Sequence, residues 1–168
     1  MGMFFEEHAK LLSDFARVSQ AAGARADYVQ GGGGNTSVKL DDTYMAVKAS
    51  GFCLSDVKPD QAYAVMNYGD IRAFYRGHAA ADFEDAEKTG SERAKAATIA
   101  VEGLPALRPS VEAGFHSLLG KFVIHSHSVY ANLACCSVEM KQVLTEAMAG
   151  ASFSWGMVPY IDPGARLS

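Results

Sequence analysis

The sequence predicts an α/β fold with a mixed sheet, because strand-like and helix-like segments alternate loosely along the chain. Two patterns support this prediction. Residues 36–40 and 44–48 are strand-like and are separated by Asp41 and Asp42, as in a β-hairpin. Residues 109–119 carry apolar groups on one helical face, with Pro109 as a favourable first residue. Gly120 ends this helix, and the apolar run 122–124 that follows is typical of a buried strand.

The remaining elements are expected in chain order as follows. Residues 3–22 have the spacing of an amphipathic helix that Gly23 ends, residues 54–61 form a polar turn, and residues 63–67 form a further strand. One or two helices are expected within residues 82–102, and helices over 129–136 and 138–148. A strand is expected over 152–161, and residues 163–167 resemble the opening of a helix. We therefore expect residues 1–168 to form one domain at the front of a longer protein.

Length and composition indicate an ordinary globular domain. The chain has 168 residues, of which 49% are hydrophobic and 20% charged. A net charge of −4 and the lack of a Lys/Arg run argue against a nucleic-acid surface. No stretch has the pattern of a signal peptide or the length of a membrane span, so no membrane partner is expected. The three cysteines, two of them adjacent at Cys135 and Cys136, are expected to be small core residues of a cytoplasmic protein.

A candidate metal site follows the strand at 122–124. His125 and His127 are two residues apart, so on a strand both imidazoles leave the same face. Glu112, near the start of the preceding helix, is the acid expected to meet them. Two imidazoles and a carboxylate that converge at the end of a strand are typical of a metal site.

Each of these residues also has a purely structural interpretation. The two histidines could be one solvated and one hydrogen-bonded core residue, and Glu112 could complement the helix dipole. His116 lies on the same helical face as Glu112 and is expected to be a hydrogen-bonded packing residue. His8 and His78 lie in an N-terminal helix and a loop and are not expected to join the site.

The glycine-rich segment from Gly31 to Ser37 is a second candidate site. Successive glycines allow a backbone concavity of N–H groups that suits an anion, and Asn35, Thr36 and Ser37 could add donors. A hydroxyl and an N–H from the Ser50-Gly51 turn could serve the same anion. The segment matches neither a Walker loop nor a dinucleotide-binding fingerprint. The alternative interpretation is a flexible hairpin loop.

Four motifs, in this order and at these separations, resemble the class II aldolase/adducin family: residues 34–37 (GNTS), 48–51 (KASG), 109–112 (PSVE) and 125–127 (HSH). Residues 160–164 (YIDPG) are similar to a later segment of that family, and the resemblance covers nearly all of the chain. It is strongest to the bacterial sugar-aldolase branch that is often fused to a short-chain dehydrogenase.

The resemblance implies a three-layer α/β/α protein with a mixed, largely antiparallel central sheet, usually a homotetramer. It implies a zinc-dependent aldolase that cleaves a ketose 1-phosphate, of the rhamnulose or fuculose type, to dihydroxyacetone phosphate and an aldehyde. His125 and His127 match two of three zinc-binding histidines, and Glu112 matches the catalytic acid/base. The positions that match those binding the substrate phosphate are Gly34, Asn35, Ser50, Gly51 and Ser110.

The sequence departs from the family pattern in two ways. Val111 stands where the aldolases often have a second serine that contacts phosphate, and the third zinc-binding histidine is expected downstream of residue 168. The alternatives are a sugar-phosphate 4-epimerase on the same fold and an adducin-like binding or assembly domain without chemistry. A metal hydrolase or deaminase is disfavoured, because neither a Cys-x-x-Cys nor a His-Glu-x-x-His motif is present.

Overall fold

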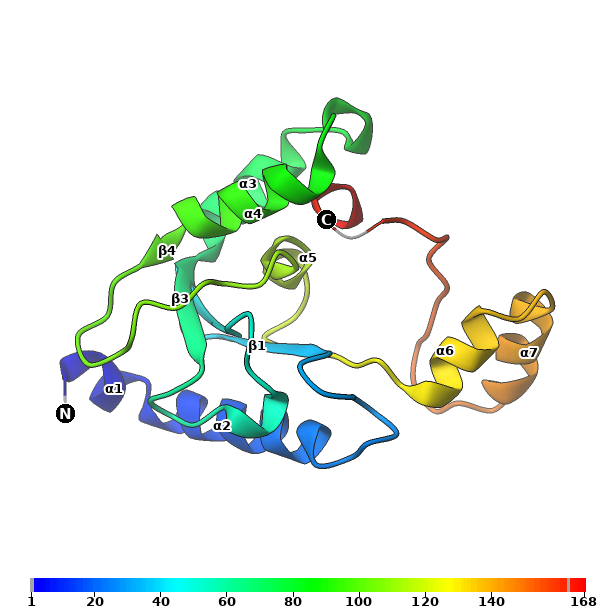
Figure 1. Cartoon of the computed structure of the whole chain (residues 1–168), viewed down its shortest axis with the longest axis horizontal. Coiled ribbons are helices and arrows are strands. Elements are labelled where there is room, and N and C mark those ends of the chain that lie inside the picture. Colours follow the sequence, from blue (N-terminus) through cyan, green and yellow to red (C-terminus); the bar gives the residue numbers. More distant parts are fainter. Residues whose placement is uncertain (1, 163) are drawn as a thin grey trace.

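A five-stranded sheet with helices on both faces forms the centre of the computed structural model, which describes residues 2–162 and 164–168 (Figure 1). The strands are β1 (Asn35–Lys39), β2 (Tyr44–Lys48), β3 (Tyr63–Asn67), β4 (Thr98–Ile99) and β5 (Phe122–His125). Their order in the sheet is β4-β3-β2-β1-β5, and each of these pairings is antiparallel. The largely antiparallel sheet is therefore confirmed, and the strands described here include no parallel pair.

Seven α-helices and three short 3-10 turns accompany the sheet in the described part of the chain. The helices are α1 (Met3–Glu7), α2 (Ala9–Gly23), α3 (Tyr68–Arg76), α4 (Ala86–Ala96), α5 (Ala113–Leu118), α6 (Val129–Cys135) and α7 (Met140–Ala147). The 3-10 turns are η1 (Leu54–Asp56), η2 (Ala80–Asp82) and η3 (Ala165–Leu167).

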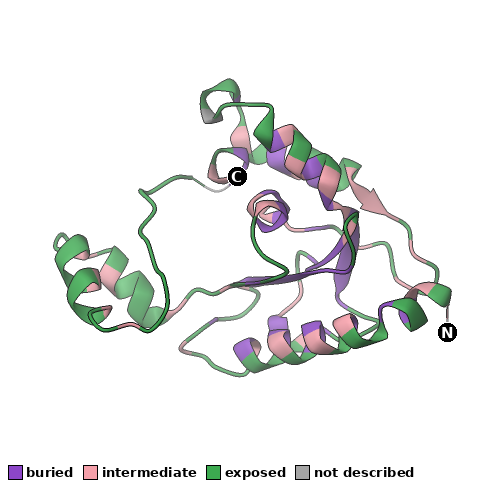
Figure 2. Cartoon of the chain, turned by 180° about the vertical axis from the view of Figure 1, so that it is seen from behind, coloured by how far each residue is buried: buried purple, intermediate pink, exposed green. Residues whose placement is uncertain are grey.

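Alternation along the strands produces the three layers. Val38, Ala46 and Val65 pack with Leu12 and Phe15 of α2 in one cluster of buried residues. The residues next to them in the strands, among them Met45, Val47 and Met66, form a second cluster with side chains of α3, α4 and α5. Figure 2 shows the buried residues concentrated in the sheet and on the inward faces of these helices. The α/β/α arrangement is confirmed.

Strand β1 is buried along its whole length although four of its five residues are polar. Each of these side chains therefore needs a partner. The hydroxyl of Thr36 pairs with that of Ser19 on α2 at 2.7 Å, and on the opposite face the hydroxyl of Ser37 lies 2.8 Å from Nδ1 of His116. Lys39 Nζ donates to three carbonyl oxygens between residues 116 and 120, at 2.7–2.9 Å. The Thr36 contact ties β1 to α2, and the contacts of Ser37 and Lys39 hold α5 and the turn into β5 against β1.

The predicted helix over 109–119 is wrong at its start. Pro109 pairs with Ala49 in an antiparallel bridge, and the backbone N–H of Ser50 donates to the carbonyl of Arg108 at 2.9 Å. These pairings hold residues 108–109 in an extended conformation, so the α-helix begins only at Ala113. The helix predicted over 3–22 is likewise divided, at His8, into α1 and α2. Sequence patterns did not indicate α3.

The segment from 128 to 161 leaves the sheet, and the main differences from expectation lie there. Helices α6 and α7 confirm the predicted helices but bury no side chain, and Figure 1 shows them away from the sheet. Residues 152–161 form no strand, because they have no strand neighbour among the described residues. Cys135 and Cys136 are exposed rather than in the core, since their helix has no buried face.

At the end of the chain, the predicted helix opening at 163–167 corresponds to the 3-10 turn η3, and Pro163 lies outside the described residues. Within the described residues, no helix combines the length and the hydrophobicity that crossing a membrane would require.

Candidate metal centre and anion cavity

Glu112, His125 and His127 converge at the end of strand β5. Each offers one ligand atom, and these atoms lie within 4.8 Å of one another. Oε1 of Glu112 is 3.2 Å from Nδ1 of His125, and the two imidazole centroids are 4.9 Å apart. The spatial convergence expected from the sequence is therefore present, although β5 ends at His125 and His127 lies in the following coil.

Two long-range pairings bring these residues together. Asn35 of β1 is the direct cross-strand partner of His125 of β5, which places the end of the glycine segment beside the imidazoles. The bridge between Ala49 and Pro109 brings the chain back from the end of β2 to Ser110 and Glu112. Residues separated by about 90 positions in the sequence therefore meet at one corner of the sheet.

Hydrogen bonds hold the Glu112 carboxylate in place. Its Oε2 accepts from the hydroxyl of Ser110 at 3.2 Å and from Nδ2 of Asn35 at 3.4 Å. Burial raises the pKa of Glu112, but the close approach of His125 and the hydrogen bond from Ser110 outweigh burial and hold that pKa below its usual value. Glu112 is therefore a carboxylate at neutral pH, able to bind a cation or accept a proton.

The donor set fits a divalent cation. Nδ1 of His125 is buried and lies 3.2 Å from Oε1 of Glu112, but it forms no hydrogen bond of good geometry with the described residues. A buried polar atom without a partner is costly, and a metal ion is one way to satisfy it. Two imidazoles and one carboxylate are ligands that zinc accepts, with further positions left for water or substrate. No other group of three or more potential ligands is found in residues 2–162 and 164–168.

A cavity of about 190 Å³ adjoins this cluster. Its lining contains most of the residues predicted to bind phosphate or metal: Gly34, Asn35, Ser50, Gly51, Ser110, Glu112 and His127. It also contains Gly32 and Gly33 of the predicted glycine segment, and Lys48, which the sequence did not single out as a site residue. A lysine at the end of the otherwise apolar strand segment YMAVK was the available signal for Lys48.

Two predicted donors are not part of the cavity. The hydroxyls of Thr36 and Ser37 point to opposite faces of the sheet and bond to Ser19 and His116. His116 is fully buried and hydrogen-bonded, which confirms its expected structural role.

The other two histidines also lie apart from the cluster. His8 is buried 4.0 Å from the carboxylate of Asp41, and His78 lies 2.8 Å from the carbonyl of Phe74. Both positions agree with the expectation that neither residue joins the site.

The glycine segment permits a close approach to β5. Gly34 has φ +73°, and a Cβ there would lie 2.8 Å from the carbonyl oxygen of His125 and 2.7 Å from the side chain of Val29. A residue with a side chain would be strained in this conformation and would also push β5 away. Gly34 is thus required for the approach of β1 to the strand that carries His125.

Substitution of Gly33 by alanine is expected to lower the affinity for a divalent cation by about 10-fold, the lower end of the effect of disturbing groups that orient metal ligands. The added Cβ would lie 2.9 Å from Nδ1 of His127, so the imidazole must turn away. Competition with a chromophoric chelator measures this affinity. Gly32→Ala is the matched control, because the nearest atom to its Cβ would be 3.8 Å away. Equal affinities of the two variants would contradict the placement of His127.

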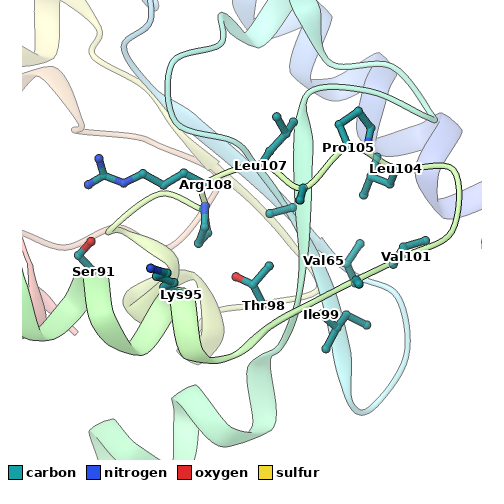
Figure 3. A pocket seen from close by; sticks show the side chains of 14 residues that line it. Val65, Ser91, Lys95, Thr98, Ile99, Val101, Leu104, Pro105, Leu107 and Arg108 are labelled. Carbon is teal, nitrogen blue, oxygen red and sulfur yellow. The ribbon is translucent and has the colours of Figure 1, made fainter.

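A larger cavity, of about 690 Å³, lies between β3, α4, β4 and residues 100–109 (Figure 3). Apolar side chains such as Val65, Ile99 and Leu104 line most of it, and Figure 3 shows Ser91, Lys95 and Arg108 together at one end. Its lining contains no His, Cys, Asp or Glu. Size alone does not locate chemistry, and the potential metal ligands Glu112 and His127 line the smaller cavity instead.

Comparison with known proteins agrees with this architecture. The sequence matches the family described as "Class II Aldolase and Adducin N-terminal domain" over residues 13–168. The fold is similar to that of a solved structure, the N-terminal class II aldolase domain of a conserved protein from Thermoplasma acidophilum, with a TM-score of 0.70 and 24% identity. The similarity covers 91% of this chain and 71% of that chain. A comparison with curated protein sequences gives no match.

Fold and site together define an α/β/α domain with a candidate metal centre at the edge strand of its sheet. The family match extends over nearly the whole sequence and includes every residue of that centre. The chain belongs to the class II aldolase and adducin family.

Proposed function

We propose that this domain is a zinc-dependent aldolase that cleaves a ketose 1-phosphate to dihydroxyacetone phosphate and an aldehyde. The observation that carries the proposal is the convergence of Glu112, His125 and His127 within 4.8 Å beside a cavity lined by glycines and hydroxyls. A domain that serves only as a scaffold has no physical need for two imidazoles and a carboxylate whose ligand atoms converge in this way.

In this proposal His125 and His127 hold the metal, together with Glu112 when substrate is absent. A bound zinc ion would supply Lewis-acid stabilisation of the negative charge that develops on the substrate oxygens. Glu112 accepts the proton of the hydroxyl group on the carbon that becomes the aldehyde. The carbon–carbon bond then breaks, its electron pair stays on the dihydroxyacetone phosphate fragment, and a proton returned to that carbon completes the reaction.

The cavity is proposed to hold the substrate phosphate. Gly34, Asn35, Ser50, Gly51 and Ser110 line it, and together they offer backbone N–H groups, hydroxyls and an amide. Binding at a phosphate distant from the reacting bond would orient the substrate toward Glu112.

Metal content provides the test. The purified chain is expected to contain about one zinc per molecule, as a single site of this ligand type holds one ion. The double variant His125→Ala, His127→Ala is expected to lose it, as measured by elemental analysis. An unchanged circular dichroism spectrum would show that the variant still folds.

The wild-type protein is also expected to release dihydroxyacetone phosphate from rhamnulose or fuculose 1-phosphate in a coupled assay. A folded wild-type chain that takes up no divalent metal and shows no turnover would overturn the proposal and favour a binding domain without chemistry.

A further inference from the structure

The larger cavity, of about 690 Å³, has no part in the proposed aldolase reaction. None of the residues that line it also lines the cavity beside Glu112 and His127, so the two cavities are separate. Its volume lies within the range of about 300–1,000 Å³ that is usual for small-molecule sites. The cavity is therefore large enough to be a binding site of its own.

Tertiary contacts hold the wall that residues 100–109 form. One end of this wall continues strand β4, which pairs with β3, and the other end is fixed by the bridge at Pro109. Between these ends, Val101 and Leu104 pack against the cluster of buried residues that α2 forms with the sheet. The shape of the cavity is therefore set by the folded domain.

Most of the lining is apolar, with Val65, Ile99 and Leu104 among its larger side chains. Thr98 also lines the cavity, but its hydroxyl donates to the carbonyl of Ala94 at 2.9 Å. A hydrocarbon body that entered this part of the cavity would remove apolar surface from water on both partners. This part of the cavity therefore favours an apolar group.

The charged groups of the lining gather at one end (Figure 3). Ser91 and Lys95 are four residues apart on α4 and share a helical face, and Arg108 comes from the wall of residues 100–109. Two cations at one end of a cavity repel each other. The lining contains no Asp or Glu, and none of the ion pairs found in residues 2–162 and 164–168 involves Lys95 or Arg108. An anion between the two side chains would offset the repulsion and accept from their N–H groups.

We propose that this cavity binds an amphipathic organic anion, a molecule with an apolar body and one carboxylate or phosphate head group. The body lies against the apolar lining, and the head group accepts from Ser91, Lys95 and Arg108. The site is separate from the metal centre, so its test does not depend on the proposed function.

Isothermal titration calorimetry of the intact chain with decanoate, below the concentration at which it forms micelles, tests the proposal. Wild-type protein is expected to bind decanoate saturably. Octanoate, which is shorter by two CH₂ groups, is expected to bind about 10- to 20-fold more weakly, since each buried CH₂ contributes about 4-fold. Decyl phosphate in the same titration distinguishes the two head groups, and saturable binding of either compound supports the site. A wild-type chain that binds neither would overturn it.

Decanol, which has the same chain without a charge, tests the role of the head group. It is expected to bind about 10-fold more weakly than decanoate, because two exposed ion pairs contribute up to about 5-fold each. Added salt is expected to weaken the binding of decanoate but not that of decanol. Equal affinities for decanoate and decanol at low ionic strength would overturn the anionic head group.

The double variant Lys95→Gln, Arg108→Gln removes both positive charges and leaves the apolar lining unchanged. It is expected to bind decanoate about 10-fold more weakly than the wild type and decanol equally well. Both side chains are exposed, so a wild-type circular dichroism spectrum is expected. Arg76→Gln, Lys88→Gln is the matched control, because it removes two exposed charges outside the cavity. The same loss of affinity in both double variants would overturn the assignment.

Backbone amide resonances locate the bound decanoate. Shifts are expected at Ile99, Val101 and Leu104, which line the cavity. The chain also exposes apolar side chains on α6 and α7, such as Leu133 and Val143. Shifts confined to those helices or to the metal centre would overturn the proposal.

A second copy of the chain is the competing occupant of this face. Such a copy would cover the cavity, exclude decanoate and make the oligomeric state depend on the residues around it. Pro105→Asp, an exposed position in the lining, is expected to sediment like the wild type in analytical ultracentrifugation. A smaller assembly in this variant, together with no binding of decanoate by the wild type, would overturn the proposal in favour of an interface.

Discussion

Glu112→Gln is expected to lower retro-aldol turnover by about 10²- to 10⁴-fold, the range that general acid–base groups contribute. The amide keeps the size of the side chain and can still accept from Ser110 and Asn35, which now bond to the carboxylate. It cannot accept the substrate proton. Because the two imidazoles remain, the variant is expected to retain bound zinc. Elemental analysis should therefore show the wild-type zinc content although turnover falls.

Glu102→Gln is a suitable control, since it makes the same change at an exposed position outside the cluster. This variant should turn over substrate like the wild type. If Glu112→Gln did the same with its metal in place, the proton transfer would have to be assigned to another group. A variant that lost both zinc and turnover would show that Glu112 acts chiefly as a ligand.

The free energy of unfolding is expected to fall as the pH drops below about 6.5, because of His116. Burial lowers the pKa of this histidine from 6.5 to about 3 in the folded protein, so it stays neutral there. The unfolded chain binds a proton near pH 6.5 and is stabilised by it. At about 1.4 kcal/mol per pH unit, the loss approaches ~4 kcal/mol near pH 3.5.

Urea denaturation at pH 7, 5 and 4 measures this effect. His116→Asn removes the titrating group and leaves an amide that can still reach the hydroxyl of Ser37, now 2.8 Å from Nδ1. The variant is expected to be less stable at pH 7 but to lose less stability on acidification. Parallel pH profiles of the two proteins would show that His116 does not cause the acid sensitivity.

Local patterns in the sequence indicated a large part of the candidate site. The His-x-His motif stands at the end of a strand, and its spacing predicted that His125 and His127 converge, although His127 lies just beyond the strand. The glycines at 31–34 likewise indicated a concave turn, and Gly31 and Gly34 have positive φ angles. The assignment of Glu112 to the same site rested on the resemblance to the family as much as on its position near the start of the predicted helix.

Features that depend on long-range pairing could not be predicted in the same way. Pro109 is a good first residue for a helix, but a bridge to Ala49, 60 residues earlier, holds it extended. The strand-like composition of residues 152–161 produces no strand, because strand formation requires a neighbouring strand. Thr36 and Ser37 stand at the end of the glycine-rich segment, yet the pleat of β1 turns both hydroxyls into the packed layers. Lys48 was missed because its partners lie on turns whose approach is a property of the tertiary structure.

Because Asn35 pairs with His125, the binding of a metal ion depends on the register between β1 and β5. A slip of one residue between β1 and β5 would carry the His125 imidazole to the opposite side of the sheet. The triad of Glu112, His125 and His127 would then no longer converge. A cation that binds the triad therefore binds the correctly aligned chain only. By mass action such an ion stabilises that alignment, by about 2.7 kcal/mol when its free concentration is 100 times its dissociation constant. Strand β5 lies at the edge of the sheet and pairs only with β1, so a bound ion would help to keep it in the correct register.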